Sequence, residues 1–152
     1  MGVFDSSEEH PPAKVRRYVI SGVAFLVLLF FAYQYLMRFH TEKRTVNQFM
    51  SAIVAGNMEQ AYRMSNPSSS YSMKDFLDDW GPDGYYGPVK SFHIENAEEE
   101  KRGTEKASGV NVTVEVSPYA PFPPDNDVAK QTKTKEVRLR VEYKDQSVGF
   151  AP

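Results

Sequence analysis

The hydrophobic positions of the chain form one long uncharged run, followed by shorter periodic patterns. The run covers 18–37 and contains no Asp, Glu, Lys or Arg. A helix of about twenty residues rises about 30 Å, which matches the hydrocarbon core of a bilayer. Basic and aromatic residues flank both ends of the run, as they do where a helix meets lipid headgroups. The pattern predicts a transmembrane helix, which with its flanks covers 14–40.

The flanks of this run also bear on its processing and orientation. Ala32 leads into Tyr-Gln-Tyr-Leu-Met rather than into the small residues of a signal-peptide cleavage site, so we expect an uncleaved anchor. The Lys and Arg residues on the two sides are equal in number. Because a short basic N-terminal flank is costly to translocate, we expect a cytoplasmic N-terminus and an extracytoplasmic C-terminal domain.

Apolar residues then recur at helical spacing from Val46 and predict an amphipathic helix. Its apolar positions are Val46, Phe49, Met50, Ile53 and Val54. No proline separates this helix from the membrane segment, so the two can be continuous. Gly56 suits the residue after a helix end, and Asn57 can cap a second helix over 58–65.

A third helix is predicted over 73–80. Ser72 and Asp75 have the spacing of a capping box, which satisfies free N–H groups in the first helical turn. The positions predicted to face inward are Phe76, Leu77 and Trp80. Gly81 and Pro82 end this helix and open a turn-rich link.

Beyond the link the pattern alternates, which is typical of strands with one buried face. The alternating segments cover 89–97, 110–116, 137–143 and, for a short last strand, 148–150. The charged stretch 98–109 predicts an exposed hairpin loop. Four prolines make 117–134 either a stiff polyproline-like excursion or a contact surface.

Together these patterns predict an α+β protein with one N-terminal transmembrane helix. About three helices and three to four antiparallel strands follow, with the sheet wrapped around the first of these helices. The predicted domains are a flexible polar tail over 1–13, the transmembrane region over 14–40 and an extramembrane domain over 41–152.

Two stretches of the extramembrane segment carry a family resemblance. Residues 49–65 read FMSAIVAGNMEQAYRMS, in which one helix ends at Gly-Asn and the next carries an Ala-Tyr pair, and the stretch from Phe76 through Trp80 leads to GYYGPV at 84–89. This order is similar to nuclear-transport-factor-2-like (cystatin-like cone) domains, including small membrane-tethered bacterial members. The resemblance covers about 45–150 and implies a helix-then-sheet cone. That superfamily holds isomerases, dehydratases and non-catalytic modules, and no position here matches the catalytic residues that its enzymes place inside the cone.

Composition narrows the chemistry further. The formal net charge is −2, from 18 Lys and Arg against 20 Asp and Glu, which is unlike a nucleic-acid-binding domain. The chain has no cysteine, so disulfides, thiolate metal sites and a cysteine nucleophile are excluded. The sequence contains no phosphate-binding loop and no hydrolase motif. We expect no catalytic residue, no cofactor, no metal site and no nucleic-acid partner.

Several residues remain as candidates for a site. His93 alternates with Phe92 and Ile94 and therefore faces away from them, either as a solvated histidine or as a general base at a pocket rim. The aromatic residues either pack the core and turns or rim a pocket for a flat ligand. These aromatic residues are Tyr62, Tyr71, Trp80, Tyr85, Tyr86 and Tyr119. Four aspartates around Trp80 are interpreted as a solvated acidic face rather than a cation site.

Two further sets of residues are predicted to contact partners. Ser21, Gly22 and Ala24 would let another helix approach the membrane segment closely. In the proline-rich stretch the contacts would come from Pro118, Tyr119, Pro121 and Phe122. We therefore expect a non-catalytic accessory, assembly or stabilising subunit of a larger membrane complex, for example an energy-transducing one, which contacts lipid and other membrane-protein subunits. The alternative is a membrane-tethered small-ligand binder or isomerase-like enzyme, which needs a cavity with converging polar groups.

Overall fold

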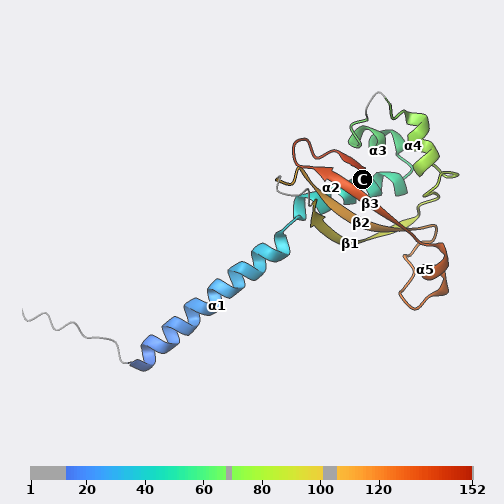
Figure 1. Cartoon of the computed structure of the whole chain (residues 1–152). Coiled ribbons are helices and arrows are strands. Elements are labelled where there is room, and N and C mark those ends of the chain that lie inside the picture. The colour runs from blue at the N-terminus through green and yellow to red at the C-terminus, as the bar shows by residue number, and fades with distance from the viewer. Residues whose placement is uncertain (1–12, 68–69, 101–105, 152) are drawn as a thin grey trace, which may run out of the picture. The chain divides into compact units, whose positions relative to one another are not determined.

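The computed structural model describes residues 13–67, 70–100 and 106–151, without the side chains of 13–17 and 35–36 (Figure 1). The chain divides into two compact units, Met1–Arg38 and Phe39–Pro152. The tail predicted over 1–13 lies outside the described residues, except for Ala13.

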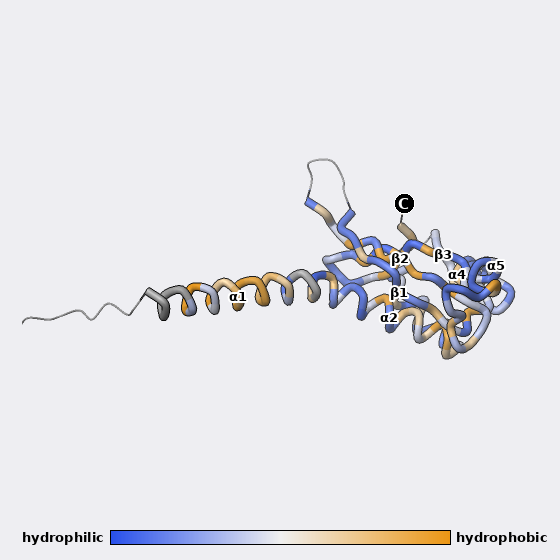
Figure 2. The backbone as a smooth tube through the Cα atoms, turned by 90° about the horizontal axis from the view of Figure 1, so that it is seen from below, coloured by the Kyte–Doolittle hydropathy of each residue, from blue (hydrophilic) through white to orange (hydrophobic). Residues whose placement is uncertain are grey.

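The first unit contains one helix, α1 (Ala13–Met37). Figure 2 shows hydrophobic residues along much of its length. Large apolar side chains on this helix are exposed, for example Phe25 at 61% and Leu28 at 67%. Among the residues that the structure describes, no helix is both long enough and apolar enough to cross a membrane.

The second unit begins with α2 (His40–Val54). This helix is separate from α1, because the chain turns at Arg38 and Phe39, and Phe39 has a left-handed backbone with φ of 64°. A left-handed residue interrupts the helical hydrogen-bond ladder. Four predicted apolar positions of α2 are buried, namely Val46, Phe49, Met50 and Ile53, whereas Val54 at the helix end is exposed.

The predicted caps of the next two helices, α3 (Met58–Met64) and α4 (Met73–Trp80), are confirmed. Gly56 has φ of 74° after the end of α2, a conformation that glycine adopts without a Cβ clash. Asn57 Oδ1 accepts the N–H of the third residue of α3 at 3.2 Å. A capping box opens α4, as its sequence indicated.

One prediction for α4 is wrong. Phe76 and Trp80 are buried, but Leu77 is 39% exposed. Because α4 is only two turns long, its core-facing side is covered by residues four positions apart, and the next residue along the chain points elsewhere.

Four strands follow in an antiparallel meander with the order β1-β2-β3-β4. Their bounds are β1 (Ser91–Glu99), β2 (Gly109–Ser117), β3 (Lys135–Glu142) and β4 (Val148–Phe150). One face of the sheet lies against α2, which contacts all four strands (Figure 1). The α+β class, with helices preceding an antiparallel sheet, is therefore confirmed.

The core lies between α2 and the inward face of the sheet, and it confirms the predicted alternation. The two central strands contribute Val110, Val112, Val114, Val116, Val137, Leu139 and Val141, all buried. In β1 a bulge between Ile94 and Asn96 shifts the inward register, so that Ala97 faces the core in place of Asn96. Tyr143, which was predicted to continue the inward face, lies beyond β3 and is exposed.

The proline-rich stretch contains a helix that the sequence patterns did not predict, α5 (Val128–Lys133). Asp127 caps it by accepting the N–H of Ala129 at 2.8 Å. Lys130 Nζ lies 3.0 Å from Glu115 Oε2 and 2.6 Å from Asp125 Oδ1. Glu115 lies on the face of β2 opposite its buried valines, so the stretch is fastened to the sheet face that α2 leaves open.

Candidate functional site

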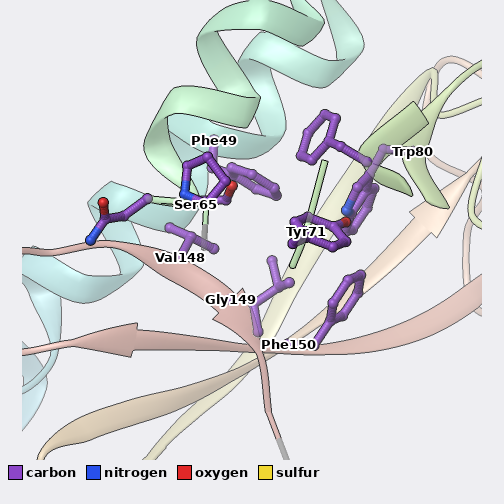
Figure 3. Close-up of a pocket in the computed structure, with 11 residues that line it drawn as sticks. Phe49, Ser65, Tyr71, Trp80, Val148, Gly149 and Phe150 are labelled. Atoms are coloured by element: carbon purple, nitrogen blue, oxygen red, sulfur yellow. The ribbon is translucent and has the colours of Figure 1, made fainter. Parts of the chain in front are cut away.

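A pocket of about 270 Å³ opens between the helices and one end of the sheet (Figure 3). Its walls come from α2, the α3–α4 connection, α4, β3 and β4, all within the second unit. The lining residues are Phe49, Ser65, Asn66, Pro67, Tyr71, Phe76, Trp80, Leu139, Val148, Gly149 and Phe150. Most of them are apolar, which is typical of small-molecule sites.

Trp80 is the centre of an aromatic wall. Its ring stacks on Tyr86 and on Phe150, with centroids 4.9 Å and 5.8 Å apart. Phe49 meets the same ring edge-on at 5.6 Å. Stacked and edge-to-face contacts of this kind fix the ring planes, so the wall is rigid. Trp80 and Phe49 are each only 2% exposed, and Phe150, at 41%, is the most accessible ring of this wall.

Hydrogen bonds brace the polar side of the pocket. The Tyr71 hydroxyl donates to Asp79 Oδ2 at 2.7 Å. The Ser65 hydroxyl donates to the carbonyl oxygen of Tyr62 at 2.6 Å, and the Tyr62 hydroxyl donates to the carbonyl oxygen of Tyr71 at 2.9 Å. The α3–α4 connection is therefore tied to α3 and α4 on both sides of the pocket.

Asn66 ties the same connection to the sheet. Its backbone is left-handed, with φ of 43°, a conformation that asparagine adopts more readily than most residues. Its side-chain amide donates to Asp145 Oδ2 at 3.1 Å, in the turn between β3 and β4. The pocket mouth is thus held by contacts between segments far apart in the sequence.

The charge state of Tyr71 follows from its surroundings. Burial, reinforced by the hydrogen bond to Asp79 and the negative charge of that carboxylate, raises the pKa of Tyr71 well above its ordinary value. The phenol therefore stays protonated further into the alkaline range than an ordinary tyrosine, with its proton directed to Asp79. None of the residues that line the pocket is basic.

The structure places the predicted rim residues in three positions. Tyr71 and Trp80 line the pocket. Tyr62 packs behind it on Phe76, and Tyr86 packs on the far side of the aromatic wall with Tyr85 at its edge. Tyr119 lies on the proline-rich stretch, where its carbonyl oxygen accepts from Ser91.

His93 is not part of the pocket. As its strand position predicted, it is exposed on the sheet face away from α2. Its ring lies 5.9 Å from the Phe122 ring, between centroids. His93 is therefore not among the residues that line this pocket.

Sequence reasoning missed most of the pocket walls. Phe49, Leu139 and Val148 read as ordinary core positions, and Phe150 read as the end of a short strand. Nothing in their periodicity distinguishes a core residue from one that lines a cavity. The only local signal was Asn66-Pro67 after α3, which marks an irregular connection.

The residues predicted to contact partners lie in both units. Ser21, Gly22 and Ala24 are exposed on α1. In the proline-rich stretch Tyr119 and Pro121 are exposed, whereas Pro118 and Phe122 are half-buried.

The four aspartates near Trp80 have separate local roles. Asp75 belongs to the capping box, Asp78 pairs with Lys74 at 2.7 Å, Asp79 holds Tyr71, and Asp83 is exposed in the following turn. Across the part of the chain that the structure describes, no group of three or more His, Asp or Glu side chains is placed to hold a metal ion.

Comparisons of the chain with protein-family models, with characterised proteins and with solved structures return no match.

Proposed function

We propose that this chain is a single-pass membrane protein with a cytoplasmic N-terminus and an extracytoplasmic C-terminal domain. The observation that carries the proposal is the uncharged segment 18–37, whose described apolar side chains are exposed along α1. Apolar surface of this extent needs a cover of lipid or of other apolar helices. The basic and aromatic flanks within 14–40 suit the two headgroup regions.

The domain acts by protein–protein contacts, without catalysis, as an accessory, assembly or stabilising subunit of a larger membrane complex. Its helix-then-meander order supports a cone of the nuclear-transport-factor-2-like kind, which the sequence resembles. Two surfaces offer contacts. One is the small-residue patch of Ser21, Gly22 and Ala24 on α1, and the other is the exposed Tyr119 and Pro121 on the stretch that Lys130 holds to the sheet.

Mild detergent extraction of the tagged full-length protein from its native membrane tests this role. We expect stoichiometric co-migration with other membrane subunits on a native gel, identified by mass spectrometry. Gly22→Leu should abolish co-migration, because a side chain at Gly22 meets nothing within 4 Å in the isolated chain but would block a closely packed helix. Val23→Leu is the matched control. Migration as a monomer or homodimer would overturn the proposal.

A second function is favoured by the pocket in the extramembrane domain. Its apolar walls and braced polar groups are those of a small-ligand site, and its volume of about 270 Å³, just below the usual range for such sites, suits only a small ligand. In this function the domain binds a small, largely apolar molecule between α2, α4 and β4.

The single tryptophan of the chain provides the readout for ligand binding. Trp80 lines the pocket and is the only Trp in the sequence. We expect small aromatic molecules to change its fluorescence saturably in the full-length protein. A Val148→Phe variant, whose larger side chain occupies the pocket, should lose that saturable change. A response that persists unchanged in this variant would contradict binding in the pocket.

A further inference from the structure

The polar groups of the pocket are unequal in hydrogen-bonding character. Tyr71 directs its only hydroxyl proton to Asp79, and Ser65 directs its only hydroxyl proton to the Tyr62 carbonyl oxygen. Both oxygens keep lone pairs with which they can accept a further hydrogen bond. Both hydroxyl protons are therefore already donated within the protein. Both hydroxyl oxygens can still accept a hydrogen bond from a ligand.

The rest of the polar lining adds an acceptor and one donor. Asn66 donates one amide N–H to Asp145 and keeps its side-chain carbonyl oxygen and its second amide N–H. Pro67 has no backbone N–H to offer. Acceptors therefore dominate the polar side of the pocket.

The charges around the pocket also favour a donor ligand over an anion. Asp79 places a carboxylate behind Tyr71, and none of the lining residues is basic. A bound anion would be repelled and would find few donors, whereas a donor group on the ligand would meet both acceptors and a favourable field.

The pocket volume limits the size of the ligand. A cavity of about 150 Å³ accommodates one benzene ring. At about 270 Å³ this pocket has room for one ring with a short substituent, or for two fused rings. The stacked wall around Trp80 favours a planar ring over a branched aliphatic group.

We propose that the pocket binds a small aromatic molecule that carries a hydrogen-bond donor, an amine or a hydroxyl, and that Tyr71 accepts the hydrogen bond from that donor. This proposal rests on the second proposed function and adds the chemical class of the ligand. Aromatic carboxylates are excluded from the site by the same acceptors and by Asp79.

A matched pair of probes tests the donor requirement. Benzyl alcohol carries the donor, benzyl methyl ether replaces its hydroxyl hydrogen with a methyl group, and benzoate is the anionic comparison. Each is titrated against the full-length protein in detergent, with Trp80 fluorescence as the readout and the signal in Val148→Phe subtracted as binding elsewhere. We expect the alcohol to bind about three- to tenfold more tightly than the ether, the range of one net hydrogen bond, and benzoate to show no saturable signal.

Variants assign the preference to Tyr71. Tyr71→Phe keeps the ring and removes the accepting oxygen, so the alcohol and the ether should bind this variant equally. Tyr119→Phe, which removes a hydroxyl outside the pocket, is the matched control and should keep the preference. Circular dichroism checks that each variant is folded, and Ser65→Leu replaces Val148→Phe as the filled-pocket variant if the latter does not fold.

The possible results distinguish the donor requirement from ligand binding itself, the second proposed function. Saturable binding of ether and alcohol with equal affinity, or binding of benzoate, would overturn the donor requirement and leave ligand binding intact. A preference that survives in Tyr71→Phe would overturn the role of Tyr71. No saturable signal with any probe would overturn both the inference and the ligand-binding function.

Discussion

Phe76 and Leu77 are neighbours on α4 in opposite environments. Phe76 is 1% exposed and meets three other aromatic rings edge-on, whereas Leu77 is 39% exposed. We expect Phe76→Ala to lower the free energy of unfolding by about 3–5 kcal/mol, because it removes a buried ring and leaves a cavity. Leu77→Ala should lower it by less than about 1 kcal/mol. Urea unfolding of the detergent-solubilised chain, followed by Trp80 fluorescence, measures both, and equal losses would contradict the orientation of α4.

Tyr71 contributes to stability in a way that depends on pH. Its pKa in the folded protein is raised by burial and by Asp79, above an unfolded value of about 10. A raised pKa means that the contribution is fully present below about pH 10 and is lost as the pH rises through the folded pKa. We expect the stability of Tyr71→Phe to fall less steeply above about pH 10 than that of the wild type. Urea unfolding at several alkaline pH values measures the stability of both proteins. An equal loss of stability with rising pH in the two would refute this prediction.

At the scale of elements, α5 and the prolines before it depend on Lys130. The hydrogen bond from Lys130, with its positive charge, holds the pKa of Asp125 below its ordinary value. This contribution is present above about pH 3.9 and is lost as the pH falls through the folded pKa. We expect Lys130→Met to speed hydrogen exchange in 118–134 at neutral pH, whereas Lys133→Met, at an exposed position of the same helix, should not. In strong acid the wild type should approach the variant, and equal exchange of all three at neutral pH would contradict the role of Lys130.

The contrast between α5 and the central strands shows which elements a sequence can predict. Val110 to Val116 alternate with polar residues, and burial of one sheet face follows directly from that alternation. The caps at Asn57 and Ser72 are equally local, because donor and acceptor lie within three residues. By contrast, α5 has six residues and no buried side chain, and its stretch is fastened by contacts to a distant strand. A pattern of neighbouring residues in the sequence cannot reveal a contact with a distant strand.

Two backbone irregularities were unpredictable for a related reason. The bulge in β1 and the left-handed Phe39 before α2 occur without a glycine or proline at the site. Packing of the whole second unit selects these conformations, and local propensity opposes at least the second of them.

At the scale of the whole domain, the pocket is a property of the packing between segments. Phe49, Tyr71, Leu139 and Phe150 belong to α2, the α3–α4 connection, β3 and β4, and only the tertiary fold brings them together. The sequence identified Tyr71 and Trp80 as aromatic candidates but gave no sign of which aromatic residues would surround an opening. Its alternation did place His93 on the sheet face away from α2, where the structure has it.

The orientation of the whole molecule can be tested because the chain has no cysteine. A single introduced thiol then reports the side of the membrane on which it lies. We expect a membrane-impermeant maleimide to label Lys133→Cys, at an exposed position of α5, in intact cells, and to label Ser6→Cys in the N-terminal segment only after lysis. The reason is that the basic flank before the apolar run resists translocation. The reverse labelling pattern would overturn the orientation, and release of either variant from membranes by alkaline carbonate would overturn the anchor itself.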